Sequence, residues 1–140
     1  MEKPLKNIYS SVLAQDPLPE ENDQKQTYEF VGYHLIASYL ECNNEALHNK
    51  TALVATMIEA VQLSGATVLN VTEHVFASGG FTALILLAES HASIHTYPEN
   101  SACFIDLFTC GHSCDAKKFE VLMERYLHPK KIYRQLLVRN

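Results

Sequence analysis

The 140-residue sequence has no hydrophobic run long enough to span a membrane and no excess of basic charge. Its longest nearly unbroken apolar run, residues 81–88, suits a buried strand, whereas a transmembrane helix needs about 20 apolar residues. The 11 basic residues are outnumbered by 16 acidic ones, and the resulting net charge of −5 argues against a nucleic-acid-binding surface. We therefore expect neither a membrane nor a nucleic acid as partner.

A secretory signal is also missing. The N-terminus lacks the basic start, apolar middle and small-residue cleavage site of a signal peptide, which predicts a cytoplasmic protein. In that compartment the four cysteines are expected to be mostly reduced. The 47% apolar and 19% charged content is that of an ordinary globular protein, and the length suffices for one domain with a sizeable core.

The apolar pattern predicts one domain over residues 27–140 after an extension over residues 1–26. The extension holds three of the five prolines and several acidic residues without an apolar period, so we expect it to be disordered. Strand-forming residues then dominate from residue 28 to residue 40. Apolar residues at three- and four-residue spacing predict a helix over residues 45–63, with Asn43 or Asn44 as its cap and Gly65 at its end.

The rest of the chain predicts more strands and a second helix. Strands are expected over residues 67–76, 81–89 and 102–109. A helix begins after a cap at Asp115 and ends before Pro129, and a last strand covers residues 132–138. This order predicts an α+β two-layer sandwich, with a largely antiparallel sheet and two helices on one face.

Reactive side chains are concentrated in residues 89–99, here called the central segment, which contains two serines, two histidines and two glutamates. In a strand, alternation puts His91, Ser93 and His95 on one face. A serine hydrolase is disfavoured, because the residues around Ser90 lack the glycines of a nucleophile elbow.

A metal site is disfavoured as well. The candidate ligands lie close in sequence and are His91, His95, Cys110, His112 and Cys114. Their spacing offers no second pair of ligands, whereas a structural zinc site needs four. We therefore predict no metal.

Self-cleavage of the backbone fits the central segment better. A single Ser or His is more often a hydrogen-bonded structural group than a catalytic one. Here, however, Ser90 Oγ can attack the carbonyl of Glu89 at the end of a buried strand, and an imidazole follows five residues later at His95. A hydroxyl such as that of Thr82 can stabilise the oxyanion.

The central segment and residues 106–111 resemble the prokaryotic S-adenosylmethionine decarboxylase proenzymes. Residues 32–35, Tyr39 and Cys42 are similar to the opening strand of that family, so the likeness runs from about residue 28 to the end. The resemblance implies a pyruvoyl enzyme, in which Ser90 undergoes an N-to-O acyl shift followed by β-elimination. The products are a β chain that ends at Glu89 and an α chain whose pyruvoyl group is made from Ser90.

The same resemblance implies a role for each site residue. His95 assists processing with the support of Thr82, and Cys110 is the proton donor in catalysis. Phe76 stacks on the adenine of the substrate S-adenosylmethionine, and Glu99 holds the ribose hydroxyls. The pyruvoyl ketone condenses with the substrate amine and is the electron sink for carboxylate loss. The product is decarboxylated S-adenosylmethionine for spermidine synthesis, and the expected assembly is a homodimer of processed αβ protomers.

Four positions depart from the family pattern. Tyr97 replaces the usual Trp, and Thr82 replaces Ser but keeps the hydroxyl. Ser38 replaces a common Glu and Tyr33 a common basic residue, in a strand where such changes can reshape the substrate pocket or the dimer interface. A pyruvoyl-dependent arginine or ornithine decarboxylase is therefore an alternative. A second alternative is an unprocessed, non-catalytic relative that regulates an active enzyme.

Overall fold

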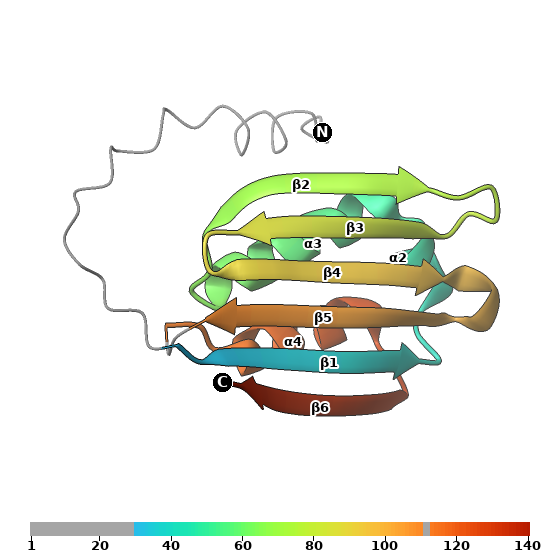
Figure 1. Cartoon of the computed structure of the whole chain (residues 1–140). Coiled ribbons are helices and arrows are strands. Elements are labelled where there is room, and N and C mark those ends of the chain that lie inside the picture. Colours follow the sequence, from blue (N-terminus) through green and yellow to red (C-terminus); the bar gives the residue numbers. More distant parts are fainter. Residues whose placement is uncertain (1–29, 111–112) are drawn as a thin grey trace.

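The computed structural model describes residues 30–110 and 113–140, so the extension predicted for residues 1–26 and His112 lie outside the described residues. The described strands form one six-stranded sheet in the order β2-β3-β4-β5-β1-β6, and all neighbouring strands are antiparallel (Figure 1). The strands are β1 (Gly32–Leu40), β2 (Val68–Val75), β3 (Phe81–Leu87), β4 (Ser90–Tyr97), β5 (Ala102–Cys110) and β6 (Lys131–Arg139).

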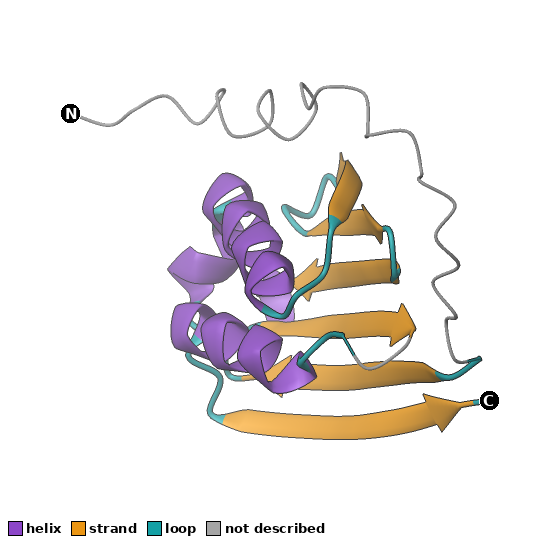
Figure 2. Cartoon of the chain, turned by 90° about the vertical axis from the view of Figure 1, so that its left-hand side faces the viewer, coloured by secondary structure: helices purple, strands orange, loops and turns teal. Residues whose placement is uncertain are grey.

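Helices cover one face of this sheet (Figure 2). They are α2 (Asn44–His48), α3 (Lys50–Leu63) and α4 (Ala116–Leu127), with a short 3-10 helix, η1 (Pro98–Asn100), between β4 and β5. The predicted α+β two-layer sandwich is therefore confirmed. Among the residues that the structure describes, no helix has the length and apolar character that a membrane crossing requires.

Side-chain caps explain where the helices begin. Asn43 accepts a hydrogen bond from the N–H of Ala46 and starts α2, and Asp115 caps α4, as predicted. The single helix expected over residues 45–63 is two helices in the structure. The break lies at Asn49, whose side chain accepts a hydrogen bond from the N–H of Ala52 and so begins a new helix.

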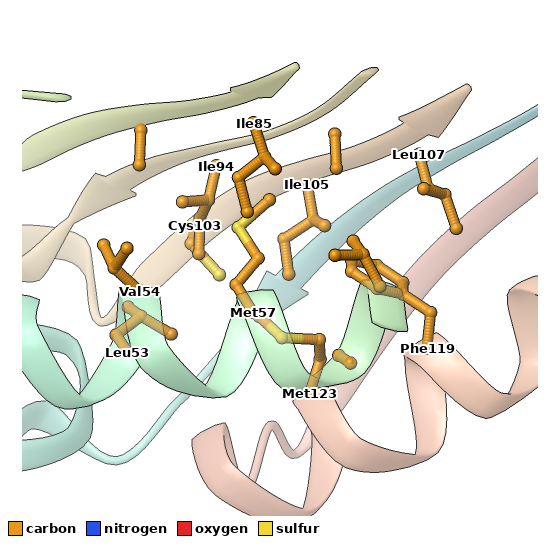
Figure 3. Packing of buried hydrophobic residues seen from close by; sticks show 14 of the residues in the cluster. Leu53, Val54, Met57, Ile85, Ile94, Cys103, Ile105, Leu107, Phe119 and Met123 are labelled. Atoms are coloured by element: carbon orange, nitrogen blue, oxygen red, sulfur yellow. The ribbon is translucent and has the colours of Figure 1, made fainter. Parts of the chain in front are cut away.

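The hydrophobic core lies between the sheet and the helices (Figure 3). Alternate residues of the central strands, such as Ile85, Ile94 and Ile105, point toward the helices and meet Met57 and Met123. All five side chains are at most 2% exposed. Burial of each such side chain stabilises the fold by about 1.5–3 kcal/mol.

No described helix covers the opposite side of the sheet, here called the open face (Figure 2). It carries large apolar side chains that remain 41–53% exposed, namely Ile36, Leu84, Leu86 and Phe104. It also carries His91, Ser93 and His95 of β4, because Ala92, Ile94 and Thr96 alternate with them and are buried on the helix side.

The antiparallel strands give the sheet two distinct ends (Figure 1). At the Ser90 end, β3 turns into β4, and β5 ends at Cys110. At the Glu99 end, β2 turns into β3, and β4 continues through η1 into β5. The central segment therefore runs the full length of the sheet, from one end to the other.

Candidate active site

The Glu89–Ser90 peptide bond lies in the tight turn between β3 and β4, and hydrogen bonds hold it on both sides. The Glu89 carbonyl oxygen accepts a hydrogen bond from the backbone N–H of Cys110 (3.1 Å). The Glu89 carboxylate accepts one from the N–H of Thr67 (2.9 Å). Ser90 pairs with Leu87 across the turn and with Thr109 of β5. An N–H directed at the Glu89 oxygen polarises the carbonyl and favours attack on its carbon.

Cys110 is the last residue of β5 and is half-buried. Ser90 and Cys110, which the sequence predicts as pyruvoyl precursor and proton donor, thus lie at the same end of the sheet. Burial raises the pKa of the nearby Cys114 thiol, and the proximity of Glu89 and Cys110 acts in the same direction, against the hydrogen bonds with Ser113 and Thr109. Cys114 is therefore a neutral thiol at pH 7.

A second group of predicted site residues lies at the Glu99 end. Thr82 Oγ1 and His95 Nδ1 are 2.9 Å apart, because the two residues are direct neighbours across β3 and β4. His74 of β2 is the neighbour of Thr82 on the other side. The ring of His74 meets the ring of Phe76 edge-on, with 4.8 Å between the centroids. A hydroxyl hydrogen-bonded to an imidazole is able to move a proton.

Two loops at this end present Phe76 and Glu99 to solvent. The N–H of Phe76 donates to the carbonyl of Gly80 (2.8 Å). Gly80 has no room for a side chain, because a Cβ there would lie 2.7 Å from the carbonyl oxygen of Thr96. Glu99 follows the buried Pro98 in η1, and its side chain is exposed. An exposed ring and an exposed carboxylate suit stacking on a base and binding of hydroxyl groups.

Within one chain, the predicted site residues form two separate groups at opposite ends of the sheet. The group at the Ser90 end comprises Glu89, Ser90 and Cys110. The group at the Glu99 end comprises Phe76, Thr82, His95 and Glu99. Ser90 and His95 both belong to β4, and about 16 Å of extended strand separates them. Because an imidazole side chain cannot cross that distance, a site that uses both groups requires two chains.

Sequence reasoning missed a third group, which is centred on Asp106 of β5. Asp106 Oδ2 lies 2.7 Å from His34 Nε2 and 3.2 Å from His91 Nε2. Asp106 Oδ1 accepts a hydrogen bond from the hydroxyl of Ser93. Burial alone would raise the pKa of Asp106, but the bonds from Ser93, His34 and His91 hold it below its usual value. The carboxylate is therefore charged, and both imidazoles donate to it.

The same group is also the one set of described His, Cys, Asp and Glu side chains arranged as metal ligands. One ligand atom each of His34, His91 and Asp106 lies within 4.8 Å of the others. Both Nε2 atoms already donate to the carboxylate, so hydrogen bonding accounts for the arrangement without an ion. His95, Cys110 and Cys114, which the sequence offered as ligands beside His91, are not part of this set.

A solved structure with the same fold defines the class of protein. The crystal structure of the adenosylmethionine decarboxylase from Aquifex aeolicus VF5 matches with a TM-score of 0.71 and 28% sequence identity. The match covers 76% of this chain and 88% of that chain. The chain is thus an α+β protein with the architecture of a decarboxylase.

Sequence comparisons identify the family. The family model for S-adenosylmethionine decarboxylase matches residues 33–140. The S-adenosylmethionine decarboxylase proenzyme of Thermosipho melanesiensis is 36% identical over 103 residues, which are 74% of this chain and 79% of that protein. The proenzyme of Brevibacillus brevis is 38% identical over 112 residues, with coverages of 80% and 84%. The chain belongs to the S-adenosylmethionine decarboxylase family.

Proposed function

We propose that this chain is a self-processing, pyruvoyl-dependent decarboxylase whose substrate is S-adenosylmethionine. One observation carries the proposal: the carbonyl of Glu89, next to Ser90, is held by the N–H of Cys110. Through this hydrogen bond, Cys110, the proposed proton donor, lies next to the bond to be cleaved and to Ser90, the nucleophile, at one end of the sheet. The relatives described above are named as S-adenosylmethionine decarboxylase proenzymes, which favours this substrate over arginine or ornithine.

Processing begins with the attack of Ser90 Oγ on the carbonyl carbon of Glu89. The carbon–nitrogen bond breaks, the amine of Ser90 is freed, and an ester joins Glu89 to the Ser90 side chain. Negative charge develops on the Glu89 oxygen during attack, where the N–H of Cys110 stabilises it. Loss of the Ser90 α-proton then breaks the bond between Cβ and the ester oxygen and releases Glu89 as a carboxylate. Addition of water and loss of ammonia convert residue 90 into a pyruvoyl group.

The surroundings of Ser90 fit a pyruvoyl group made in place. Residue 90 lies between Leu87 and Thr109, so the strands on both sides would keep the group near Cys110. The group supplies an electron sink for loss of the substrate carboxylate. Cys110 then returns a proton to the substrate α-carbon. An acidic protein with net charge −5 also favours the approach of a sulfonium cation.

We further propose that two chains pair through their open faces to complete each site. A twofold axis that lies in the interface, perpendicular to the strands, places the two open faces against each other with their strands running in opposite directions. The Ser90 end of one chain then lies over the Glu99 end of its partner. Packed sheets lie about 10 Å apart, which side chains from both faces can bridge. The exposed apolar residues Ile36, Leu84, Leu86 and Phe104 support burial of this face.

In this arrangement, the roles of the two groups become compatible. His95 and Thr82 of the partner assist cleavage at Ser90, while Phe76 and Glu99 of the partner bind the adenosyl part of the substrate. Ser38, one of the departures from the family pattern, is in register with the exposed Phe104 on the same face. Ser38, which stands where Glu is common in the family, therefore lies within the proposed interface.

The test of the function is the fate of the purified full-length chain. Mass spectrometry should detect two fragments, residues 1–89 and residues 90–140, with the mass of a pyruvoyl group at the start of the second. Ser90→Ala should remain one chain. The processed protein should release carbon dioxide from S-adenosylmethionine; release only from arginine or ornithine would overturn the substrate. A wild-type chain that stays intact would support the non-catalytic relative instead.

A further inference from the structure

Asp106 links three strands on the open face. It lies on β5, between β4 and β1, and pairs with Ser93 on one side and with Ile36 on the other. Ser93 and His91 reach it from β4, and His34 reaches it from β1. Hydrogen bonds to an ionised acceptor are about twice as strong as neutral ones. One carboxylate therefore ties the start of β4 to its neighbours.

Ring packing holds the two imidazoles in place. The Phe108 ring centroid lies 5.2 Å from that of His34 and 5.7 Å from that of His91. The guanidinium of Arg139 lies 4.3 Å from the Phe108 ring centroid. Gly32 makes room for this ring, because a Cβ at position 32 would lie 2.4 Å from it. His34 thus reaches Asp106 from a packed setting, whereas His91, whose side chain is 44% exposed, contacts the Phe108 ring on one side.

Cleavage changes what holds the start of β4. In the intact chain, the Glu89–Ser90 bond anchors the strand to the turn, and the Thr67 N–H anchors Glu89 in its place. After cleavage, residue 90 is a chain terminus, and termini fray unless they are tied down. His91 and Ser93 are the first two open-face residues after that terminus, and both are bound to Asp106.

We propose that Asp106 is a positioning residue that holds the start of the processed α chain against β5, and so keeps the pyruvoyl group made from Ser90 near Cys110. This inference rests on the proposed function. Its specific consequence is that Asp106 matters more after cleavage than before it. In the uncleaved chain the covalent bond already fixes residue 90, whereas in the processed enzyme only strand pairing and the hydrogen bonds to Asp106 hold the start of β4.

The test compares Asp106→Asn in two backgrounds by amide hydrogen exchange over residues 91–95. In the processed enzyme, loss of the charged acceptor should speed exchange about tenfold. In the uncleavable Ser90→Ala chain, the same change should have little effect. Asp106→Asn should be processed to the same extent as the wild-type chain. Its kcat for S-adenosylmethionine should fall about tenfold and its KM should change less than about twofold, because only the alignment of the reacting group is lost.

Matched variants separate positioning from general stability. His34→Gln weakens a bond to the same carboxylate from β1, which is not part of the α chain, and should speed exchange over residues 91–95 less than Asp106→Asn does. Ser93→Ala should speed it, and Ser93→Thr, which keeps the hydroxyl, should restore slow exchange. If Asp106→Asn does not fold, the comparison of Ser93→Ala with Ser93→Thr tests the inference by the same exchange measurement.

Two results would overturn the inference: faster exchange of equal size in both backgrounds, or an unchanged kcat in processed Asp106→Asn. Failure of the proposed function gives a different result, because the wild-type chain itself would then remain uncleaved.

Discussion

Two variants that each lack one half of the proposed site should restore processing when their chains pair. Ser90→Ala removes the cleavable residue but keeps His95, whereas His95→Ala keeps Ser90 and loses the imidazole. If the Ser90 end of one chain meets the Glu99 end of its partner, each variant alone forms dimers without a complete site. A mixed dimer has one complete site, in which Ser90 of the His95→Ala chain faces the intact His95 of the other chain.

The expected extent of cleavage follows from random pairing. When equal amounts of the two variants pair at random, about half of the His95→Ala chains acquire a Ser90→Ala partner and are cleaved, against almost none in the variant alone. If each site instead lay within one chain, mixing would restore nothing, because every chain lacks either Ser90 or His95 whichever partner it has.

The assay is coexpression followed by a denaturing gel and mass spectrometry of the fragments 1–89 and 90–140. No label is needed, because only the His95→Ala chain can be cleaved. The control partner carries both Ser90→Ala and His95→Ala, so it pairs equally well but supplies no imidazole. Cleavage in the mixture that does not exceed that of the separate variants would refute the shared site. Equal rescue by the control partner would exclude His95 as the group supplied.

Three further substitutions test other parts of the site and fold. Cys110→Ala keeps the backbone N–H that holds the Glu89 carbonyl, so processing should persist while kcat falls about 100-fold or more, as measured by carbon dioxide release. Phe76→Ala removes a ring that is 49% exposed, and should raise KM for S-adenosylmethionine about tenfold through lost stacking, without changing the unfolding midpoint. Asn49→Ala removes the cap of α3, and should lower the free energy of unfolding by about 1 kcal/mol in a urea titration, whereas Asn49→Asp should retain most of it.

Local patterns in the sequence predicted most of the fold. Alternation predicted that His91, Ser93 and His95 share one face of a strand, and the structure confirms this, with Ala92 and Ile94 buried on the opposite face. The break at Asn49 was missed, since the apolar spacing continues across it and only the cap contact distinguishes two helices from one.

The arrangement of the site could be predicted only in part. Motif resemblance named Ser90, His95 and Cys110, and their roles stay predictions. It did not indicate that His95 lies at the other end of the sheet, because a spacing of five residues has no spatial meaning until the segment is known to be extended. The Asp106 group depends on the registers of β4 with β5 and of β5 with β1, and the latter joins residues about 70 positions apart.

The strand order has a consequence for the life of the processed molecule. Cleavage before Ser90 would assign β1, β2 and β3 to one fragment and β4, β5 and β6 to the other, so the order β2-β3-β4-β5-β1-β6 interleaves the two. Neither fragment could leave without dismantling ladders on both sides of β1. Maturation would therefore release no propeptide, yet it would turn later refolding into a bimolecular reaction that depends on concentration. The precursor, folding as a single chain, would be the only form able to assemble this sheet efficiently when dilute.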